Sequence, residues 1–166
     1  MPTQTMTEKD QYLATFDREY EITMRLLRAY PTDKADLKPS PRSKSAREIA
    51  WMLAVTQQVI PMLLGNELPG MDPPPPPASW DAVLAALQAA HSDTMTKLRA
   101  MRPEDMNGTV RLPTGPKQMS DVRRGDAMWM FLYDTIHHRG QFSVYQRIAG
   151  GKMPSVYGPT ADEPWW

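Results

Sequence analysis

Asp134 and His138 are the residues whose types and spacing point most directly to chemistry. They are four positions apart within an apolar helical pattern, and residues i and i+4 lie one turn apart on the same face of an α-helix. A carboxylate oxygen and an imidazole nitrogen both bind divalent metal ions. The pair therefore predicts part of a metal site that faces the core, and a complete site would need a third ligand.

A simpler interpretation of the same pair is a hydrogen bond between His138 and Asp134 that satisfies a buried polar side chain. His137 lies about 100° around the helix from His138, so we expect it to face a neighbouring helix or a second subunit. Gln141 and Tyr145 lie one and two turns beyond His138 on nearly the same face. They are predicted to line a pocket or to hydrogen-bond the residues that hold a ligand. No catalytic residue is assigned.

Four segments with helical periodicity must position these side chains. Thr7, Ser45 and Ser79 are predicted to cap the first three helices, and Ser45 forms a capping box with Glu48. Pro61 is expected to kink the second helix near its end. Four helices of roughly 20 residues without a sheet indicate an all-α fold, an antiparallel four-helix bundle. The predicted helices cover residues 8–30, 46–64, 80–101 and a last segment that begins between 120 and 126 and ends at 150.

The connections between these segments are rich in proline and glycine. Residues 66–78, with five consecutive prolines, are predicted to form a stiff polyproline linker between the second and third helices. A proline-binding domain as partner is the alternative. Residues 103–119 are predicted to be irregular, with no strand longer than Thr109 to Leu112. The whole of 1–166 is predicted to be one domain, with residues 1–6 as a flexible N-terminus.

Composition excludes several functional classes. The 166 residues suffice for one domain with a real core. With 19 basic and 19 acidic residues the net charge is zero, which predicts neither a nucleic-acid partner nor a membrane partner. The absence of cysteine excludes disulfides, thiolate ligands and a cysteine nucleophile. Without a secretory signal or an apolar run of about 20 residues, a cytoplasmic protein is expected.

The sequence resembles the DinB/YfiT-like proteins, a group of small bacterial four-helix bundles. The segments that carry the resemblance are HHRGQFSVYQRIAGGKMPSVYGPTAD (137–162) and PTDKADLKPSPRSKSAREIAWMLA (31–54). The resemblance implies a bundle with one long crossover connection and a homodimeric assembly. It also implies a divalent cation, zinc or nickel, bound by a histidine of the second helix and by two residues four apart in the fourth.

The ligand set implied by this resemblance is incomplete in the present sequence. Asp134 and His138 fall on the two fourth-helix positions, but Met52 falls on the position of the second-helix histidine. A neutral thioether is a poor ligand for zinc or nickel, and Met52 is expected to be a packed core or pocket residue. His91 would replace the missing ligand only if it projected inward at the same depth, and water is the other candidate.

Three functions therefore stay open. The first is a DinB-like protein with a degenerate metal site, binding metal weakly or not at all and taking up an unidentified small molecule. The alternative, implied by the resemblance, is a metal-dependent thiol S-transferase or hydrolase that uses Asp134 and His138. The third is a purely structural or regulatory homodimer.

Other residues of the last third are predicted to be structural or to form the dimer interface. Arg139 is assigned a structural rather than a catalytic role. Gly140, in a helix interior, costs up to ~1 kcal/mol relative to alanine, so we expect it to allow close packing of a neighbouring helix. The aromatic residues exceed what one bundle interior readily absorbs, which favours a homodimer. They are Trp129, Phe131, Tyr133, Trp165 and Trp166, and Tyr157 of the tail is predicted to serve packing or a dimer interface.

Overall fold

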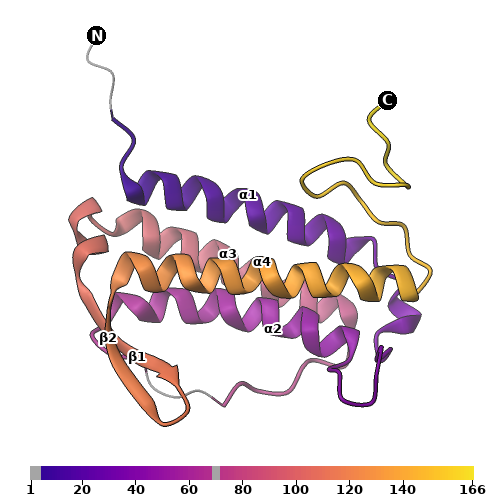
Figure 1. Ribbon diagram of the computed structural model, residues 1–166, viewed down its shortest axis with the longest axis horizontal. Helices are drawn as coiled ribbons and strands as arrows, with labels where there is room; N and C mark the ends of the chain where they lie inside the picture. Colours follow the sequence, from indigo (N-terminus) through magenta and orange to yellow (C-terminus); the bar gives the residue numbers. More distant parts are fainter. Residues whose placement is uncertain (1–4, 69–71) are drawn as a thin grey trace.

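Four α-helices form the body of the molecule in this computed structural model, which describes residues 5–68 and 72–166 (Figure 1). Thr7 and Ser45 each begin a helix with a capping box, in which the hydroxyl and a carboxylate three residues later satisfy free amides. Ser79 caps the third helix by accepting from the amide of Ala82. The helices are α1 (Glu8–Arg28), α2 (Ala46–Val59), α3 (Trp80–Ala100) and α4 (Arg124–Ile148).

A short 3-10 helix follows each of the first three helices. These 3-10 helices are η1 (Thr32–Lys34), η2 (Ile60–Leu64) and η3 (Pro103–Asn107). The predicted kink at Pro61 is a change of helix type, because α2 stops at Val59 and η2 continues the chain in a tighter winding. Proline lacks the backbone donor that an α-helix needs at that point.

The order of the helices around the bundle is α1, α3, α2, α4, so that α1 contacts α3 and α4 but lies diagonally across from α2. Lys9 at the start of α1 donates to the carbonyl of Arg99 at the end of α3, which makes that pair antiparallel. Glu8 pairs with Arg123 at the start of α4, so α1 and α4 run in the same direction. The bundle is therefore antiparallel in only two of its four neighbouring pairs, α1–α3 and α2–α4.

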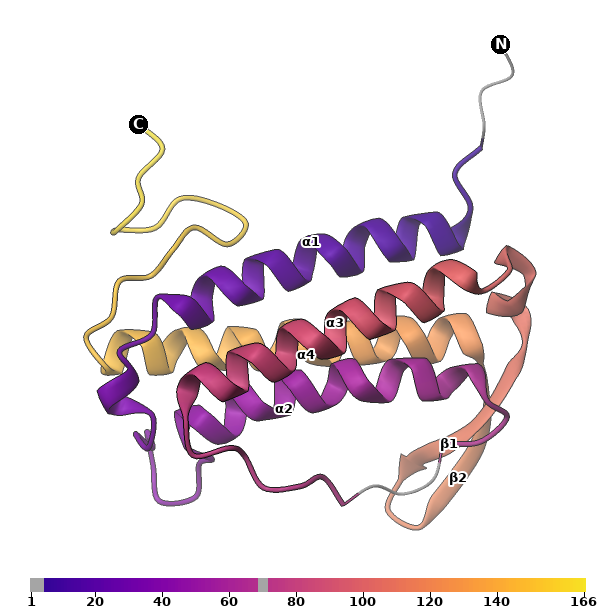
Figure 2. The same cartoon turned by 180° about the vertical axis from the view of Figure 1, so that it is seen from behind.

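The second parallel pair, α2 and α3, requires the connection between them to return along the length of the bundle. Figure 2 shows its described parts, 65–68 and 72–79, leaving one end of the molecule and reaching α3 at the other. The indole N–H of Trp51 donates to the carbonyl of Pro74 at 2.6 Å, which holds the proline-rich segment against α2. Residues 69–71 of the predicted linker and 1–4 of the predicted N-terminus lie outside the described residues.

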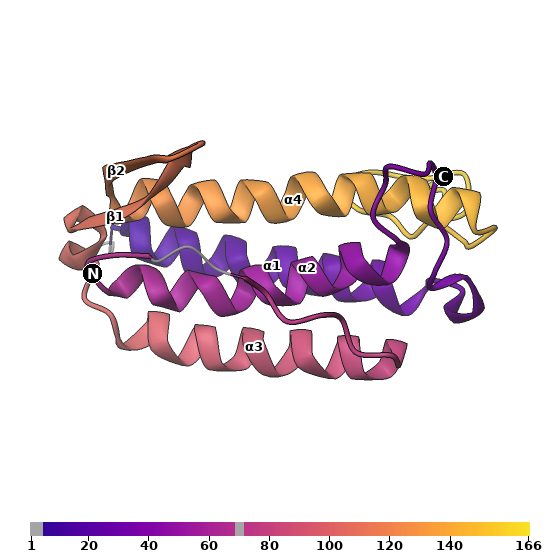
Figure 3. The ribbon, with the colours of Figure 1, turned by 90° about the horizontal axis from the view of Figure 1, so that it is seen from below.

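A two-stranded hairpin, β1 (Thr109–Gly115) and β2 (Gln118–Arg123), replaces the irregular segment expected between α3 and α4. Val110 and Leu112 are buried and alternate with exposed neighbours, the pattern of a strand with one covered face. The all-α prediction therefore holds for the bundle and is wrong for this connection. The hairpin lies at the end of the bundle where α4 begins (Figure 3).

The core fills the space between all four helices with aliphatic and aromatic side chains from each of them. In Figure 3, α2 lies between α3 and α4, the position from which its side chains reach both. At one end of this core the Trp80 ring stacks on Tyr30, with centroids 4.9 Å apart, and on Phe142, with centroids 6.1 Å apart. Within the described chain, no helix is both long and apolar enough to cross a membrane.

Candidate metal and ligand-binding site

Asp134 and His138 lie on successive turns of α4, with Asp134 Oδ1 3.4 Å from His138 Nε2. Their side chains are 50% and 20% exposed, so the prediction that the pair faces the core is wrong for Asp134. The cause is that α4 carries apolar residues on its outer face as well as its inner one, and periodicity did not distinguish the two.

The spacing of these two donor atoms fits a shared cation. Two ligands bound at about 2.1 Å with a tetrahedral angle between them are about 3.4 Å apart. Oδ1 of Asp134 and Nε2 of His138 have this separation in the structure. Among the described residues, however, no three or more histidine, aspartate or glutamate side chains are grouped to hold a metal ion. The donor set therefore fits two of the three protein ligands of a typical site.

Hydrogen bonds on α4 fix the orientation of the His138 ring. Nδ1 of His138 lies 2.9 Å from Oε1 of Gln141, so the tautomer with the proton on Nδ1 donates to this oxygen and leaves Nε2 free to bind a metal ion. The Gln141 amide in turn lies 3.0 Å from Nε2 of His137. A metal-binding histidine usually donates its other ring N–H to a carboxylate, a backbone carbonyl or water, and the Gln141 amide oxygen lies where it can take this part. His137 itself is exposed and contacts Gln141 rather than another helix.

A cavity of about 480 Å³ opens beside His138, between α2, α4 and the loop that precedes α2. Met52, which is partly buried, lies on the α2 side of this cavity, opposite the residues of α4. The structure thus brings Met52 and His138 to one surface cavity, with Asp134 one turn before His138. The lining residues are Pro39, Ser43, Lys44, Ile49, Met52, His138, Gln141, Val144 and Tyr145.

Tyr145 connects the two sides of this cavity. Its ring is buried and stacks on Phe142 with the centroids 6.2 Å apart. Its hydroxyl donates to the backbone carbonyl of Lys44 at 2.8 Å, so the end of the loop is held against α4. Gln141 and Tyr145 therefore do what their predicted positions allow: one orients His138, and the other shapes the cavity wall.

His91 lies in a different part of the bundle and does not replace the missing ligand. Its ring is stacked on Tyr20 with a centroid distance of 3.7 Å, and it packs against Phe16 on the other side. Nε2 lies 2.9 Å from Asp17 Oδ1, and Nδ1 contacts the Gln57 amide. Burial lowers the pKa of His91, and the hydrogen bond that His91 donates to Asp17 only partly opposes this effect.

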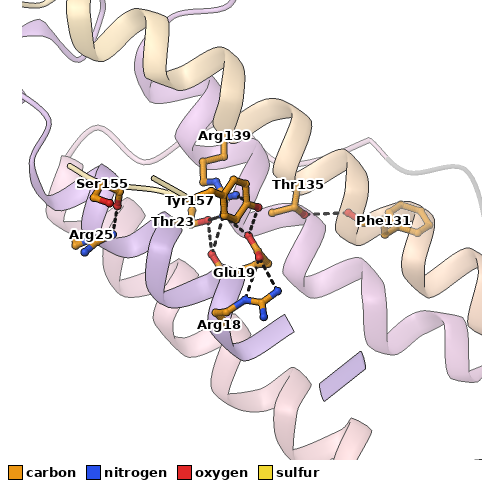
Figure 4. A network of polar contacts seen from close by, with 9 residues as sticks. All are labelled: Arg18, Glu19, Thr23, Arg25, Phe131, Thr135, Arg139, Ser155 and Tyr157. Carbon is orange, nitrogen blue, oxygen red and sulfur yellow. Dashed lines mark hydrogen bonds and ion pairs between the residues drawn. The ribbon is translucent and has the colours of Figure 1, made fainter. Parts of the chain in front are cut away.

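Arg139, the residue after His138, forms a buried ion pair with Glu19 of α1 (Figure 4). Nη1 of Arg139 donates to Glu19 Oε2 at 2.7 Å, and both side chains are 2–3% exposed. The hydroxyl of Tyr157 donates to the same Glu19 oxygen at 2.6 Å and accepts from Arg139 Nη2. Burial tends to raise the pKa of Glu19, but the hydrogen bonds from Tyr157 and Arg139 outweigh it and hold that pKa below its ordinary value.

Sequence reasoning missed the partners of Arg139, although it assigned that residue a structural role. Glu19 is charged and occupies a position on the buried face of α1, between Phe16 and Tyr20, which is the signal that could have marked it. A buried carboxylate requires a cationic or hydrogen-bonding partner. The chain position of that partner could not be read from the sequence.

The predicted role of Gly140 is wrong, and the aromatic residues of the last third divide into two groups. A Cβ atom added to Gly140 would meet nothing within 4 Å, so within the described chain no helix packs closely there. Trp129 and Phe131 are partly buried and pack against the core of the same chain. The remaining four aromatic residues of the predicted set are exposed, namely Tyr133, Tyr157, Trp165 and Trp166.

Comparison with known proteins places the chain in a family. A sequence model of the DinB superfamily matches residues 15–142, which include most of α1, all of α2 and α3, and Asp134 and His138 of α4. The chain belongs to the DinB superfamily. Among curated proteins it is similar to YrdA of Bacillus subtilis, with 24% identity over 161 residues, covering 93% of this chain and 90% of YrdA.

Solved structures share the fold. A DinB-like protein from Bacillus cereus superimposes with a TM-score of 0.73 at 19% identity, covering 88% of this chain and 95% of that one. YfiT from Bacillus subtilis superimposes with a TM-score of 0.69 at 15% identity, covering 92% and 94%. YfiT is described as a probable metal-dependent hydrolase with an unusual four-helix bundle topology. At these identities the likeness establishes the fold alone.

Proposed function

We propose that this protein binds a small organic molecule in the cavity between α2, α4 and loop 39–44, beside a degenerate metal site. Asp134 and His138 hold a divalent cation weakly there, because Met52 occupies the side from which a third strong ligand would come. The observation that carries the proposal is the shared cavity: Met52 and His138 line it together, and His138 is oriented by Gln141.

The wall of the cavity supports a small organic ligand. Ile49, Met52 and Val144 provide apolar surface, whereas Ser43 and His138 provide polar groups at its sides. Pockets that bind small molecules combine mostly apolar walls with a few placed polar groups, and volumes of roughly 300–1,000 Å³ are usual. A cavity of about 480 Å³ falls within this range.

Elemental analysis of protein purified without an affinity tag tests the metal part of this proposal. We expect clearly less than one zinc or nickel ion per chain after purification. One firmly retained ion per chain would contradict a degenerate site and would favour the second function below.

A thermal-shift screen tests the ligand part, with two variants that each place a tryptophan at one exposed position of α4. Val144 lines the cavity, whereas Ile148 lies one turn further along α4 outside it, and both are 54% exposed. Compounds that stabilise the wild type should also stabilise Ile148→Trp but not Val144→Trp, because the larger side chain at 144 narrows the cavity. Equal stabilisation of both variants would place the ligand elsewhere.

The second candidate function is a metal-dependent hydrolase or thiol S-transferase. It is supported by the 3.4 Å separation of the Asp134 and His138 donor atoms and by the description of YfiT as a probable metal-dependent hydrolase. A divalent cation would act there as a Lewis acid. If this function is right, the wild type retains metal and His138→Ala does not. If the site is degenerate, the wild type and His138→Ala both retain little metal.

A further inference from the structure

Tyr157 is attached to the bundle by its hydroxyl rather than by its ring. The residue is 61% exposed, yet its hydroxyl reaches the buried Glu19–Arg139 pair and contacts both members. The Arg139 guanidinium carbon also lies 5.1 Å from the centroid of the Tyr157 ring. Because most of the ring remains in solvent, apolar burial does not account for its position, and the polar contacts do.

The segment that carries Tyr157, residues 153–163, is here called the C-terminal strap. Figure 1 shows it turning back from the end of α4 toward α1. Met153 belongs to the core and Val156 packs against it, but from Tyr157 onward each residue is partly buried or exposed, so this outer part of the strap is held mainly by polar contacts. Segments held in this way open locally at lower free energy than core helices do. Its other attachments to the bundle are Asp162 to Arg147 and Arg25 to the Ser155 carbonyl, whereas the hydrogen bonds from the Met153 amide to Asp162 and from the Ser155 amide to Glu163 lie within the strap.

The ion pair beneath the strap joins α1 to the turn of α4 that carries His138. Arg139 Nη1 donates both to the Glu19 carboxylate and, at 3.2 Å, to the Glu19 backbone carbonyl. The guanidinium therefore binds a side chain and the backbone of α1. The rotation of α4 at this turn determines where His138 Nε2 lies relative to Met52 across the cavity.

We infer that Tyr157 is a positioning residue for the candidate site: through Arg139 it holds the α4 turn that carries His138. Release of the strap removes one hydrogen-bond partner from each member of a buried ion pair, which favours entry of water between α1 and α4. The inference rests on the proposed role of His138 as a ligand. It assigns the strap a function at the site although no strap residue lines the cavity.

The Tyr157→Phe variant tests this inference in metal-free, full-length protein. Tyr133→Phe is the matched control, because Tyr133 lies on α4, is also 61% exposed, and its hydroxyl has no hydrogen bond within the described chain. NMR would follow the ring ¹⁵N signals of His138 and hydrogen exchange of the amides of residues 135–139. For Tyr157→Phe we expect shifted ring signals and about tenfold faster exchange, since a lost hydrogen bond to a charged group is worth about one such factor or more.

A second variant acts on the strap without touching the ion pair. Asp162→Asn weakens the attachment to Arg147 and should change the same signals in the same direction, by a smaller amount. Two outcomes would overturn the inference. In the first, Tyr157→Phe gives the same His138 ring signals and the same amide exchange as Tyr133→Phe. In the second, Tyr157→Phe lowers the melting temperature but leaves those signals and the local exchange unchanged, so that Tyr157 is only structural. Because these measurements contain no metal, they remain informative even if metal analysis contradicts the proposed function.

Discussion

Oδ1 of Asp134 and Nε2 of His138 are 3.4 Å apart on successive turns of α4. This distance suits two ligands of one tetrahedral ion, and the pair combines a charged oxygen with an oriented nitrogen. Met52 lines the cavity that His138 also lines. Its thioether favours soft ions such as Cu(I) over zinc or nickel, so the proposed defect of the site lies in one side chain.

Replacing that side chain should repair the site. We expect Met52→His to bind Zn²⁺ or Ni²⁺ at least about tenfold more tightly than the wild type, a gain of ~1.4 kcal/mol. Without metal the variant should be less stable than the wild type, because an imidazole then lies partly buried without a partner. Titration calorimetry and melting with and without metal measure both effects.

Met62→His is the control for this repair, because Met62 is exposed on η2 and does not line the cavity. It should leave metal affinity close to that of the wild type. If Met52→His and the wild type have equal metal affinity, whether both bind metal tightly or neither binds it, then Met52 does not occupy the vacant ligand position.

Removing only one member of the Glu19–Arg139 pair should strongly destabilise the folded state. We expect Glu19→Ala to lower the free energy of unfolding by about 3–5 kcal/mol, because it leaves Arg139 buried without its counterion. The double variant Glu19→Leu with Arg139→Met should lose less than either single variant, since no unpaired charge remains. Urea denaturation of Glu19→Leu, Arg139→Met and the double variant completes the cycle, and additive losses would contradict the coupling of these two residues.

Stability should fall on the acidic side of neutrality because of His91. Burial holds its folded-state pKa below the ordinary value of about 6.5. The folded state therefore binds fewer protons than the unfolded state in this window, and the stability present above about pH 6.5 is lost as the pH falls toward the folded pKa. In His91→Gln this part of the pH dependence should disappear. The free energy of unfolding of both proteins is measured by denaturation at several pH values between 5 and 8. If its slope against pH is the same in His91→Gln as in the wild type, His91 does not contribute.

A homodimer remains our expectation for the assembly, and the outer face of α4 is the surface we propose for it. Met130, Tyr133, Val144 and Ile148 are exposed at helical spacing along this face, and the space beside Gly140 is open. Light scattering should give twice the 18.8 kDa of one chain. A stable pair should bury at least ~1,000 Å² in total.

One charge on this face should dissociate such a dimer. Met130 and Met62 are exposed to similar extents, 44% and 41%, but only Met130 lies on α4. Met130→Glu should therefore shift the mass toward that of a monomer, while Met62→Glu should not. A wild-type mass of one chain at micromolar concentration would defeat the expectation.

The sequence predicted those parts of the fold that depend on local chemistry. Thr7, Ser45 and Ser79 mark the starts of α1, α2 and α3 because a cap needs only its own turn of helix. The pairing of α1 with α4 in parallel could not be predicted in the same way. It depends on contacts such as Glu8 with Arg123, which join distant segments and have no local pattern.

For the candidate site, the spacing of Asp134 and His138 was sufficient to place them on one face of a helix, but not to say which face. Helix α4 buries Leu132 and Phe142 while exposing Val144 and other apolar residues on its outer side. With apolar residues on both sides, periodicity does not identify the buried face. The partner of Arg139 was missed for a related reason, because Glu19 lies 120 residues away.

The placement of α1 beside α4 has a consequence for how the protein is made. Of the four helices α1 leaves the ribosome first and α4, which covers one of its sides, leaves last, and contacts of high sequence separation form slowly. Nascent chains that stop before Arg124 should therefore remain sensitive to protease, with Glu19 still in water. Protection should appear in one step once Ile148 has left the exit tunnel, so the ligand cavity and the folded state would arise together.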